Sequence, residues 1–233
     1  KFEPARGRFK LALEKDPDFL VAQMNLARLA LVEQKPDEAV RAYEKALDMN
    51  PKHVGAMIGL AALARSRNDN AEAENWLLRA NQADPQALQP ILVLTEMYLR
   101  ANEGLKASNM LSGLSPAQAD LPTVLRLKGM AQLQAGDFAS ATHTLKKLAE
   151  IHPSLMEGWF QLARAQAASG DIEGSRASFQ RAIALDAQHK VPVVWVGLAE
   201  LELRERRYDA ALELAQQIKE HFPENVFGHD IEA

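Results

Sequence analysis

Residues 20–53 read LVAQMNLARLALVEQKPDEAVRAYEKALDMNPKH, and these 34 residues form the unit that repeats along the chain. It holds two apolar segments with helical spacing, separated by a short polar break. Its Pro51 recurs 34 residues earlier as Pro17, 34 residues later as Pro85, and two further periods on as Pro153. A fixed period of this length indicates stacked copies of one helix–turn–helix unit.

Windows of this length, started at residues 20, 54, 88, 122, 156 and 192, place residues of one kind at the same position. The twentieth position is small throughout: Ala39, Ala73, Ala107, Ala141, Ser175 and Ala211. The eighth position holds small residues or threonine: Ala27, Ala61, Thr95, Gly129, Ala163 and Ala199. Small side chains let two helices approach closely, and a larger one would overpack by roughly 1–3 kcal/mol. Each window is therefore predicted to form a tight helical hairpin.

The pattern resembles the tetratricopeptide repeat (TPR), which has a bulky residue at position 4, Leu at 7, small residues at 8, 20 and 27, an aromatic residue or Leu at 24, and Pro at 32. Position 4 is held by Trp159 and Trp195, and position 32 by Pro17, Pro51, Pro85, Pro153 and Pro223. Position 24 is aromatic in Tyr43 and Phe179. Four residues depart from the pattern: Gln23 at position 4, Lys128 at position 7, and Ala119 and Ala187 at position 32.

The resemblance implies an all-α fold, a right-handed α-solenoid of about six tandem TPR units with partial repeats at both ends. We expect thirteen helices, essentially no strand, and one solenoid domain over residues 1–233, a fragment of a longer protein. The repeats are placed at 1–19 (partial), 20–53, 54–87, 88–121, 122–155, 156–191, 192–225 and 226–233 (partial).

Residues that end and begin helices recur at fixed places in the windows. One position is shared by residues that tolerate a left-handed backbone: Asn68, Asn102, Gly136 and Gly170. Three aspartates that follow are predicted to cap the next helix: Asp69, Asp137 and Asp171. Residues 112–122 break the rule with two prolines and a glycine. We expect the preceding helix to end near Leu111, and a hinge or a change of superhelix pitch to follow.

Composition excludes several classes of protein. A net charge of −4 gives no broad basic surface for nucleic acid. The longest apolar runs have about half the length that a bilayer needs, so no transmembrane segment is predicted. The chain has no cysteine, which excludes disulfides and thiolate metal sites in this region.

No enzyme motif is present, and the six histidines lack partners at metal-ligand spacing. The carboxylates are spread along helix faces, and no pair is isolated for acid–base chemistry. We predict no catalytic, cofactor-binding or metal-binding residue, no cofactor and no enzymatic activity in this chain.

A binding surface remains. The resemblance implies that the first helix of each pair lines a concave groove, with positions 2, 5, 9 and 12 facing a partner. The predicted partner-binding residues are Met24, Arg28, Ile58, Arg65, Leu92, Glu96, Arg126, Met130, Phe160, Arg164, Val196 and Glu200. Apolar pockets would bury side chains of a protein or peptide, and arginines would orient it through forked hydrogen bonds. Alternatively, the apolar members pack against the second helix of their own repeat, and the arginines only favour solubility.

Three functions remain open: a scaffold that binds a peptide or partner protein, a module appended to an enzyme such as a glycosyltransferase, and self-assembly through exposed terminal repeats. The chain would be a monomer or associate weakly. A narrower resemblance, to bacterial TPR lipoproteins of exopolysaccharide export and of the sorting of proteins with a C-terminal Pro-Glu-Pro signal (PEP-CTERM), implies the periplasm or the outer membrane. A cytoplasmic location is the alternative.

Overall fold

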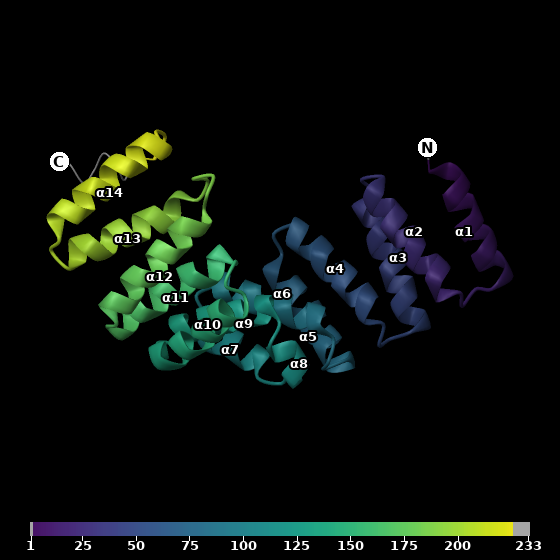
Figure 1. Cartoon of the computed structure of the whole chain (residues 1–233). Helices are drawn as coiled ribbons and strands as arrows, with labels where there is room; N and C mark the ends of the chain where they lie inside the picture. The colour runs from purple at the N-terminus through teal and green to yellow at the C-terminus, as the bar shows by residue number, and fades with distance from the viewer. Residues whose placement is uncertain (1, 226–233) are drawn as a thin grey trace. The chain divides into compact units, whose positions relative to one another are not determined.

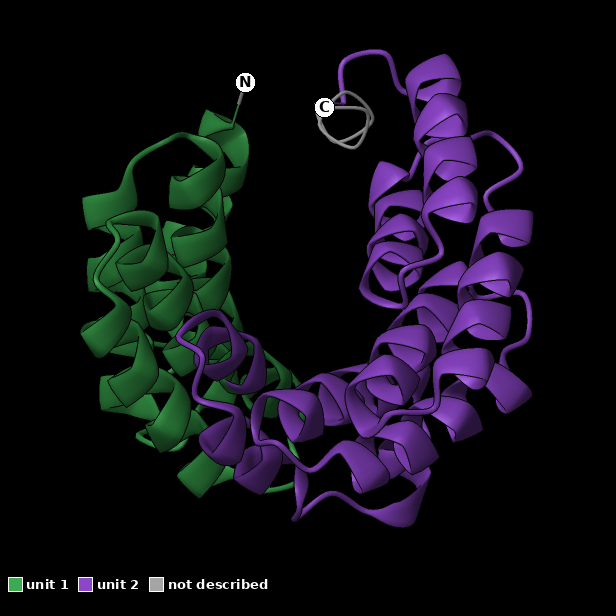
Figure 2. Cartoon of the chain, turned by 90° about the vertical axis from the view of Figure 1, so that its left-hand side faces the viewer, with its two compact units in different colours: residues 1–94 green, residues 95–233 purple. Residues whose placement is uncertain are grey.

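The computed structural model describes residues 2–225, and all regular structure in that range is helical (Figure 1). The chain forms two compact units, residues 1–94 and 95–233, shown in green and purple in Figure 2. The boundary falls within one helix, α6 (Leu88–Arg100). The predicted all-α class of stacked helical hairpins is confirmed. The partial repeat predicted at 226–233 lies outside the described residues.

Unit 1 consists of one lone helix, two helical hairpins and the first half of α6. Its helices are α1 (Glu3–Lys15), α2 (Leu20–Val32), α3 (Pro36–Met49), α4 (Val54–Ser66) and α5 (Asn70–Ala83). Each helix packs against the next along the chain from α1 to α5. These bounds follow the two-helix period that the sequence predicts for windows 20–53 and 54–87.

Unit 2 continues the pattern through the second half of α6. Its further helices are α7 (Gly104–Leu111), α8 (Pro116–Ala119), α9 (Pro122–Gln134), α10 (Phe138–Ile151), α11 (Met156–Ser169), α12 (Ile172–Leu185), α13 (Pro192–Arg204) and α14 (Tyr208–His221). The prediction that a helix ends near Leu111 is confirmed.

The expected count of thirteen helices was wrong, because the described residues hold fourteen. The additional helix is α8, a single turn in the segment that was predicted to be irregular. Pro116 opens this turn with its backbone angle already fixed. The amide and hydroxyl of Ser115 both donate to Gln118 Oε1, at 3.2 and 3.0 Å, and hold the turn closed.

The turns inside the hairpins have the predicted left-handed backbone. The residues at the shared position have φ of 60° at Asn68, 59° at Asn102, 79° at Gly136 and 87° at Gly170. Gln34 and Arg206 adopt the same conformation, each with φ of 59°, although neither residue type favours it. The repeat geometry therefore overrides the local preference at these two positions.

The aspartates after these turns cap the following helices, as predicted. Asp69 Oδ1 accepts a hydrogen bond from the Glu72 amide at 2.9 Å, and Asp137 Oδ1 accepts one from the Ser140 amide at 3.1 Å. The hydrogen bonds to Ser140 lower the pKa of Asp137. Asp171 Oδ1 accepts from the Gly174 amide at 3.0 Å. Three second helices therefore begin where a side chain satisfies a free backbone N–H.

The small residues meet where the hairpins close, and all of the predicted position-20 residues are fully buried. Ser175 is the polar member of this set, and its hydroxyl donates to the Ala163 carbonyl at 2.8 Å. That bond joins positions 20 and 8 of one repeat and satisfies a buried hydroxyl. The core of each hairpin thus depends on close backbone contact rather than on large side chains.

Candidate functional site

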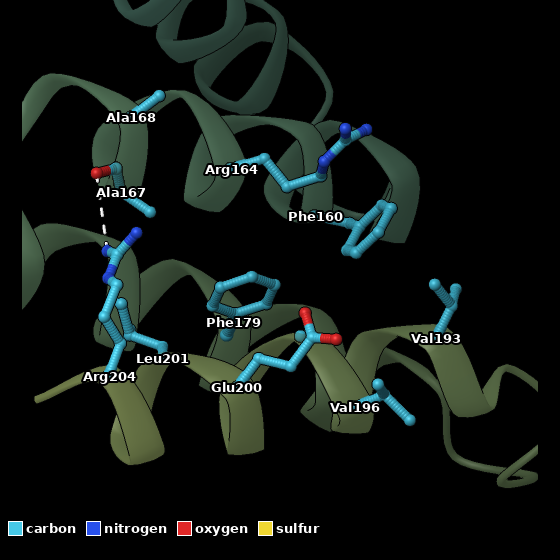
Figure 3. Close-up of a pocket in the computed structure, with 11 residues that line it drawn as sticks. Phe160, Arg164, Ala167, Ala168, Phe179, Val193, Val196, Glu200, Leu201 and Arg204 are labelled. Atoms are coloured by element: carbon cyan, nitrogen blue, oxygen red, sulfur yellow. Dashed lines mark hydrogen bonds between the residues drawn. The ribbon is translucent and has the colours of Figure 1, made fainter. Parts of the chain in front are cut away.

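A cavity of about 730 Å³ opens between α11 and α13 of unit 2, and we call it the α11–α13 pocket (Figure 3). Phe160 and Arg164 reach it from α11, and Val196 and Glu200 from α13. These four residues were predicted as partner-binding positions 5 and 9 of consecutive repeats. Phe179 of α12 lies between them at the base of the pocket.

Two aromatic rings form the floor of the pocket. The ring centroids of Phe160 and Phe179 lie 6.1 Å apart at 58°, a tilted arrangement that aromatic pairs favour. Gly197 makes room for the second ring, because a Cβ there would lie 2.7 Å from Phe179 Cε1. Val193 and Val196 extend the apolar surface along α13. The floor can therefore receive an apolar side chain from a ligand.

Charged groups surround this floor. The Arg164 guanidinium carbon lies 5.8 Å from the Phe160 ring centroid, and Nη1 donates to Gln161 Oε1 at 3.1 Å. Arg204 Nη2 makes a long contact of 3.5 Å to the Ala167 carbonyl. The Glu200 carboxylate has no hydrogen bond or ion pair within the described residues. The rim thus offers two guanidinium groups and one free carboxylate to a ligand.

A buried ion pair fixes α13 against α12 behind the pocket. Arg176 Nε and Nη2 donate to the two carboxylate oxygens of Glu202, at 2.5 and 3.1 Å. Glu202 is 3% exposed, and its hydrogen bonds with Arg176 raise the pKa of the guanidinium. A bidentate pair of this kind sets both distance and orientation. It holds the helix that carries Val196 and Glu200 in a defined register.

Unit 1 repeats part of this arrangement. Tyr43 of α3 is buried at the position that corresponds to Phe179, and Gly59 of α4 makes room for its ring, as Gly197 does in unit 2. Burial raises the pKa of Tyr43, and the positive charge of Arg28 partly opposes that shift.

The remaining predicted partner-binding residues differ in how deeply they are buried and in what they contact. Met24 is buried in the core of unit 1, and Ile58 packs partly buried against the same cluster. Arg126 Nη1 lies 3.3 Å from Met130 Sδ on α9. The others are half-buried on first helices: Arg65, Leu92 and Glu96. None of these residues lines the α11–α13 pocket, so the structure brings together four members of the predicted set there.

Sequence reasoning missed Phe179, Leu201 and Arg204 as lining residues. Position 24 was not among the predicted partner-binding positions, yet Phe179 at that position lines the pocket. The sequence did contain a pattern that could have identified Phe179. Position 24 is aromatic at Tyr43 and at Phe179, and in each case the next window has a glycine at position 6, Gly59 or Gly197. An aromatic residue paired with that glycine marks a place where a ring passes between two first helices.

Within residues 2–225, no group of three or more His, Asp or Glu side chains is arranged to hold a metal ion. No helix among the described residues is long and apolar enough to cross a membrane.

The sequence is similar to known repeat proteins over much of its length. A family profile described as tetratricopeptide repeat matches residues 24–87, 126–190 and 160–226. The TPR repeat-containing protein PA0015 of Pseudomonas aeruginosa is 34% identical over 61 residues, 26% of this chain and 58% of that protein. The chain thus spans less than two thirds of this relative.

Two solved structures show the shared fold. PilW, a type IV pilus biogenesis factor, has a TM-score of 0.73 at 17% identity, over 92% of this chain and 98% of that one. YrrB, a TPR protein with an unusual peptide-binding site, has a TM-score of 0.52 at 15% identity, over 96% of this chain and 97% of that one. The repeat spacing, the stacked hairpins and the family profile agree, and the chain belongs to the tetratricopeptide repeat family.

Proposed function

We propose that this chain is a non-enzymatic scaffold that binds a segment of a partner protein, with the α11–α13 pocket as a principal contact. The observation that carries the proposal is the pocket itself. It combines a floor of two aromatic rings with two guanidinium groups and a free carboxylate on one accessible face. Ligand sites in proteins typically combine an apolar base with a few polar groups that fix orientation.

The chemistry of the pocket defines the ligand. An aliphatic or aromatic side chain would lie over Phe160 and Phe179, where it leaves water. An acidic group beside it would pair with Arg164, whose planar guanidinium favours carboxylates. A backbone N–H or a basic side chain would donate to Glu200. An extended segment with an apolar residue next to an acidic one fits this arrangement.

The relatives support binding and suggest a setting. YrrB is described as having a peptide-binding site, and PilW as a pilus biogenesis factor. On this likeness we place the scaffold in an assembly of the bacterial cell envelope. A tethered lipoprotein of exopolysaccharide export or PEP-CTERM sorting is the narrower form of this proposal, and the module appended to an enzyme is its alternative.

The test compares two double variants, one inside the pocket and one outside it. Arg164→Glu with Glu200→Lys reverses the charge of two pocket residues, whereas Arg181→Glu with Glu213→Lys makes the same exchange at exposed positions outside the pocket. Peptides are selected from a random dodecapeptide phage library on the wild-type chain, and their affinities are measured by fluorescence anisotropy.

The pocket variant should bind the selected peptides at least about tenfold more weakly, because two attractive contacts become repulsive. The control variant should bind as the wild type does. Equal binding by both variants, with unchanged circular dichroism, would move the site away from α11 and α13.

A further inference from the structure

A second cavity, of about 620 Å³, lies on unit 1 between α1 and α3, and we call it the α1–α3 groove. Its floor is α2, through Gln23 and Leu26, and its walls are the second helices of successive repeats. It therefore opens on the side of the repeats opposite to the predicted partner-binding positions of α2. None of the predicted partner-binding residues lines it.

The groove exists because two residues depart from the repeat. Gln23 occupies position 4, where the next repeat has Met57, and Ala42 occupies the place of Trp76. In that next repeat, Met57 is buried and Trp76 packs against the same core, so large side chains occupy the equivalent space. Gln23 instead donates its amide to the Ala42 carbonyl at 3.0 Å, which leaves the floor low and partly polar.

Unpaired cations face one another across this floor. Lys10 lines the groove from α1, and Arg41 and Lys45 line it from α3, one helical turn apart. All three are exposed and have no hydrogen bond or ion pair among the described residues. The carboxylate of Glu14 is the free acidic group of the lining. Arg6 differs, because it is paired with Glu33 and Glu38.

The next repeat shows the contrast. The positions that correspond to Lys10 and Arg41 hold Glu44 and Asn75, and Arg79, which corresponds to Lys45, stacks over the Trp76 ring at 4.3 Å. Unpaired positive charge and open space thus occur together in the α1–α3 groove, but not at the equivalent positions of the next repeat. Like charges on two walls, with Leu26 beside the polar Gln23 on the floor, favour a ligand that carries negative charge on both sides of an aliphatic stripe.

We propose that the α1–α3 groove docks an acidic segment of a partner protein, with aliphatic side chains over Leu13 and Leu26 and carboxylates toward Lys10, Arg41 and Lys45. This site is separate from the α11–α13 pocket and does not depend on the function proposed for it. Since the cations are exposed, the interaction weakens as salt is raised.

The next repeat indicates which substitutions would fill the groove, because it has Met57 and Trp76 at the positions of Gln23 and Ala42. Gln23→Met with Ala42→Trp installs the residues of the next repeat and fills the groove without removing a charge. Phage carrying random dodecapeptides are first depleted on this filled variant and are then selected on the wild-type chain. The selected peptides should be rich in Asp and Glu with interspersed Leu or Ile.

Affinities of the selected peptides are measured by fluorescence anisotropy. The filled variant should lose binding, and Lys10→Glu with Lys45→Glu should weaken it at least about tenfold. Arg8→Glu with Lys52→Glu makes the same charge change outside the groove lining and should have little effect. The Arg164→Glu/Glu200→Lys variant should bind normally, which separates this site from the first.

Three results would overturn the proposal: no peptides enriched over the filled variant, enriched peptides without acidic residues, or equal loss of binding in both charge-reversal variants. Sedimentation with phosphatidylglycerol vesicles is measured in parallel. If the wild-type chain binds vesicles, the Lys10/Lys45 variant does not, and no acidic peptide is selected, the groove binds an anionic lipid surface instead. Melting temperatures of all variants establish that each one is folded.

Discussion

Single residues in this protein often adopt conformations that the repeat imposes on them. Gln34 lies at the turn between α2 and α3 with φ of 59°, in the left-handed region that glycine and asparagine favour. The equivalent turns use asparagine or glycine at Asn68 and Gly136. Gln34 therefore retains strain that the neighbouring repeats avoid.

Gln34→Gly should stabilise the protein by about 0.5–1 kcal/mol, because relief of the strained backbone exceeds the added entropy of the unfolded chain. The matched reverse change is Gly136→Ala, where φ is 79° and a Cβ would meet nothing within 4 Å. That change should destabilise by about 1–2 kcal/mol through the backbone alone. Urea unfolding monitored by circular dichroism measures both, and opposite signs are expected.

Close approach is a second constraint at the scale of a residue. Gly197→Ala would press a Cβ against the Phe179 ring at the floor of the α11–α13 pocket, so we expect a loss of roughly 1–3 kcal/mol. Gly7→Ala is the control, since Gly7 lies inside α1 with nothing within 4 Å of the added atom. It should stabilise by about 0.5–1 kcal/mol through helix propensity. Equal effects in thermal unfolding would contradict the packing argument.

At the scale of an element, ion pairs join α1 to the turn after α2. Glu33 is paired with both Lys35 and Arg6, and Arg6 also donates to Glu38 at 2.8 Å. The hydrogen bonds from Lys35, and next from Arg6, lower the pKa of Glu33 below its ordinary value of 4.5. The folded protein thus holds the proton of this carboxyl less readily than the unfolded chain does.

Because folding lowers the pKa of Glu33, this carboxyl stabilises the protein more at neutral pH than in acid. Glu33 contributes stability above about pH 4.5, where it is ionised in both states, and the contribution is lost as pH falls through the lower, folded pKa. Glu33→Gln should therefore lower the melting temperature at neutral pH, and the difference from wild type should shrink in acid. Glu44→Gln serves as the control, because Glu44 is exposed and has no hydrogen bond or ion pair within residues 2–225. A difference independent of pH would contradict this account.

The segment between α7 and α9 departs from the regular hairpin seen in the other full repeats. Helix α7 has 8 residues, whereas the other second helices of the full repeats have 14, and a single turn at α8 replaces the rest. We predict a local hinge here, because fewer backbone groups take part in continuous helix. Amide hydrogen exchange at 112–122 should be faster than at turns 50–53 and 152–155. Equal protection at all three places would exclude the hinge.

At the scale of the whole molecule, we predict that partner-binding positions in each of the two units contribute to partner capture. Arg28 and Arg164 are exposed and Arg126 is half-buried, so their replacement by Glu should change stability little, by about 0.5 kcal/mol each. The triple variant should keep its circular dichroism spectrum and melting temperature. It should capture less partner from an extract of the native host, quantified by mass spectrometry against wild type. Unaltered capture would favour the outer faces, including the α1–α3 groove.

Sequence alone was sufficient to predict the repeat, the helix end near Leu111 and the aspartate caps, although it missed the short helix α8. Period, small residues and turn chemistry all act over short distances, so Asp69 and Leu111 could be placed from local rules. Helix periodicity placed Phe160 and Arg164 on one side of a single helix, and the resemblance to the tetratricopeptide repeat implied that Glu200 shares their face.

The packing of helices against one another sets which of those residues surround a cavity, and the sequence pattern does not reveal it. Met24 and Phe160 hold the same repeat position, yet Phe160 lines the α11–α13 pocket and Met24 lies within the core of unit 1. The difference arises from neighbours on other helices, such as Phe179. The α1–α3 groove likewise depends on Ala42 and Gln23 meeting across two helices. Such spaces are set by the volumes of side chains far apart in sequence, which no local pattern contains.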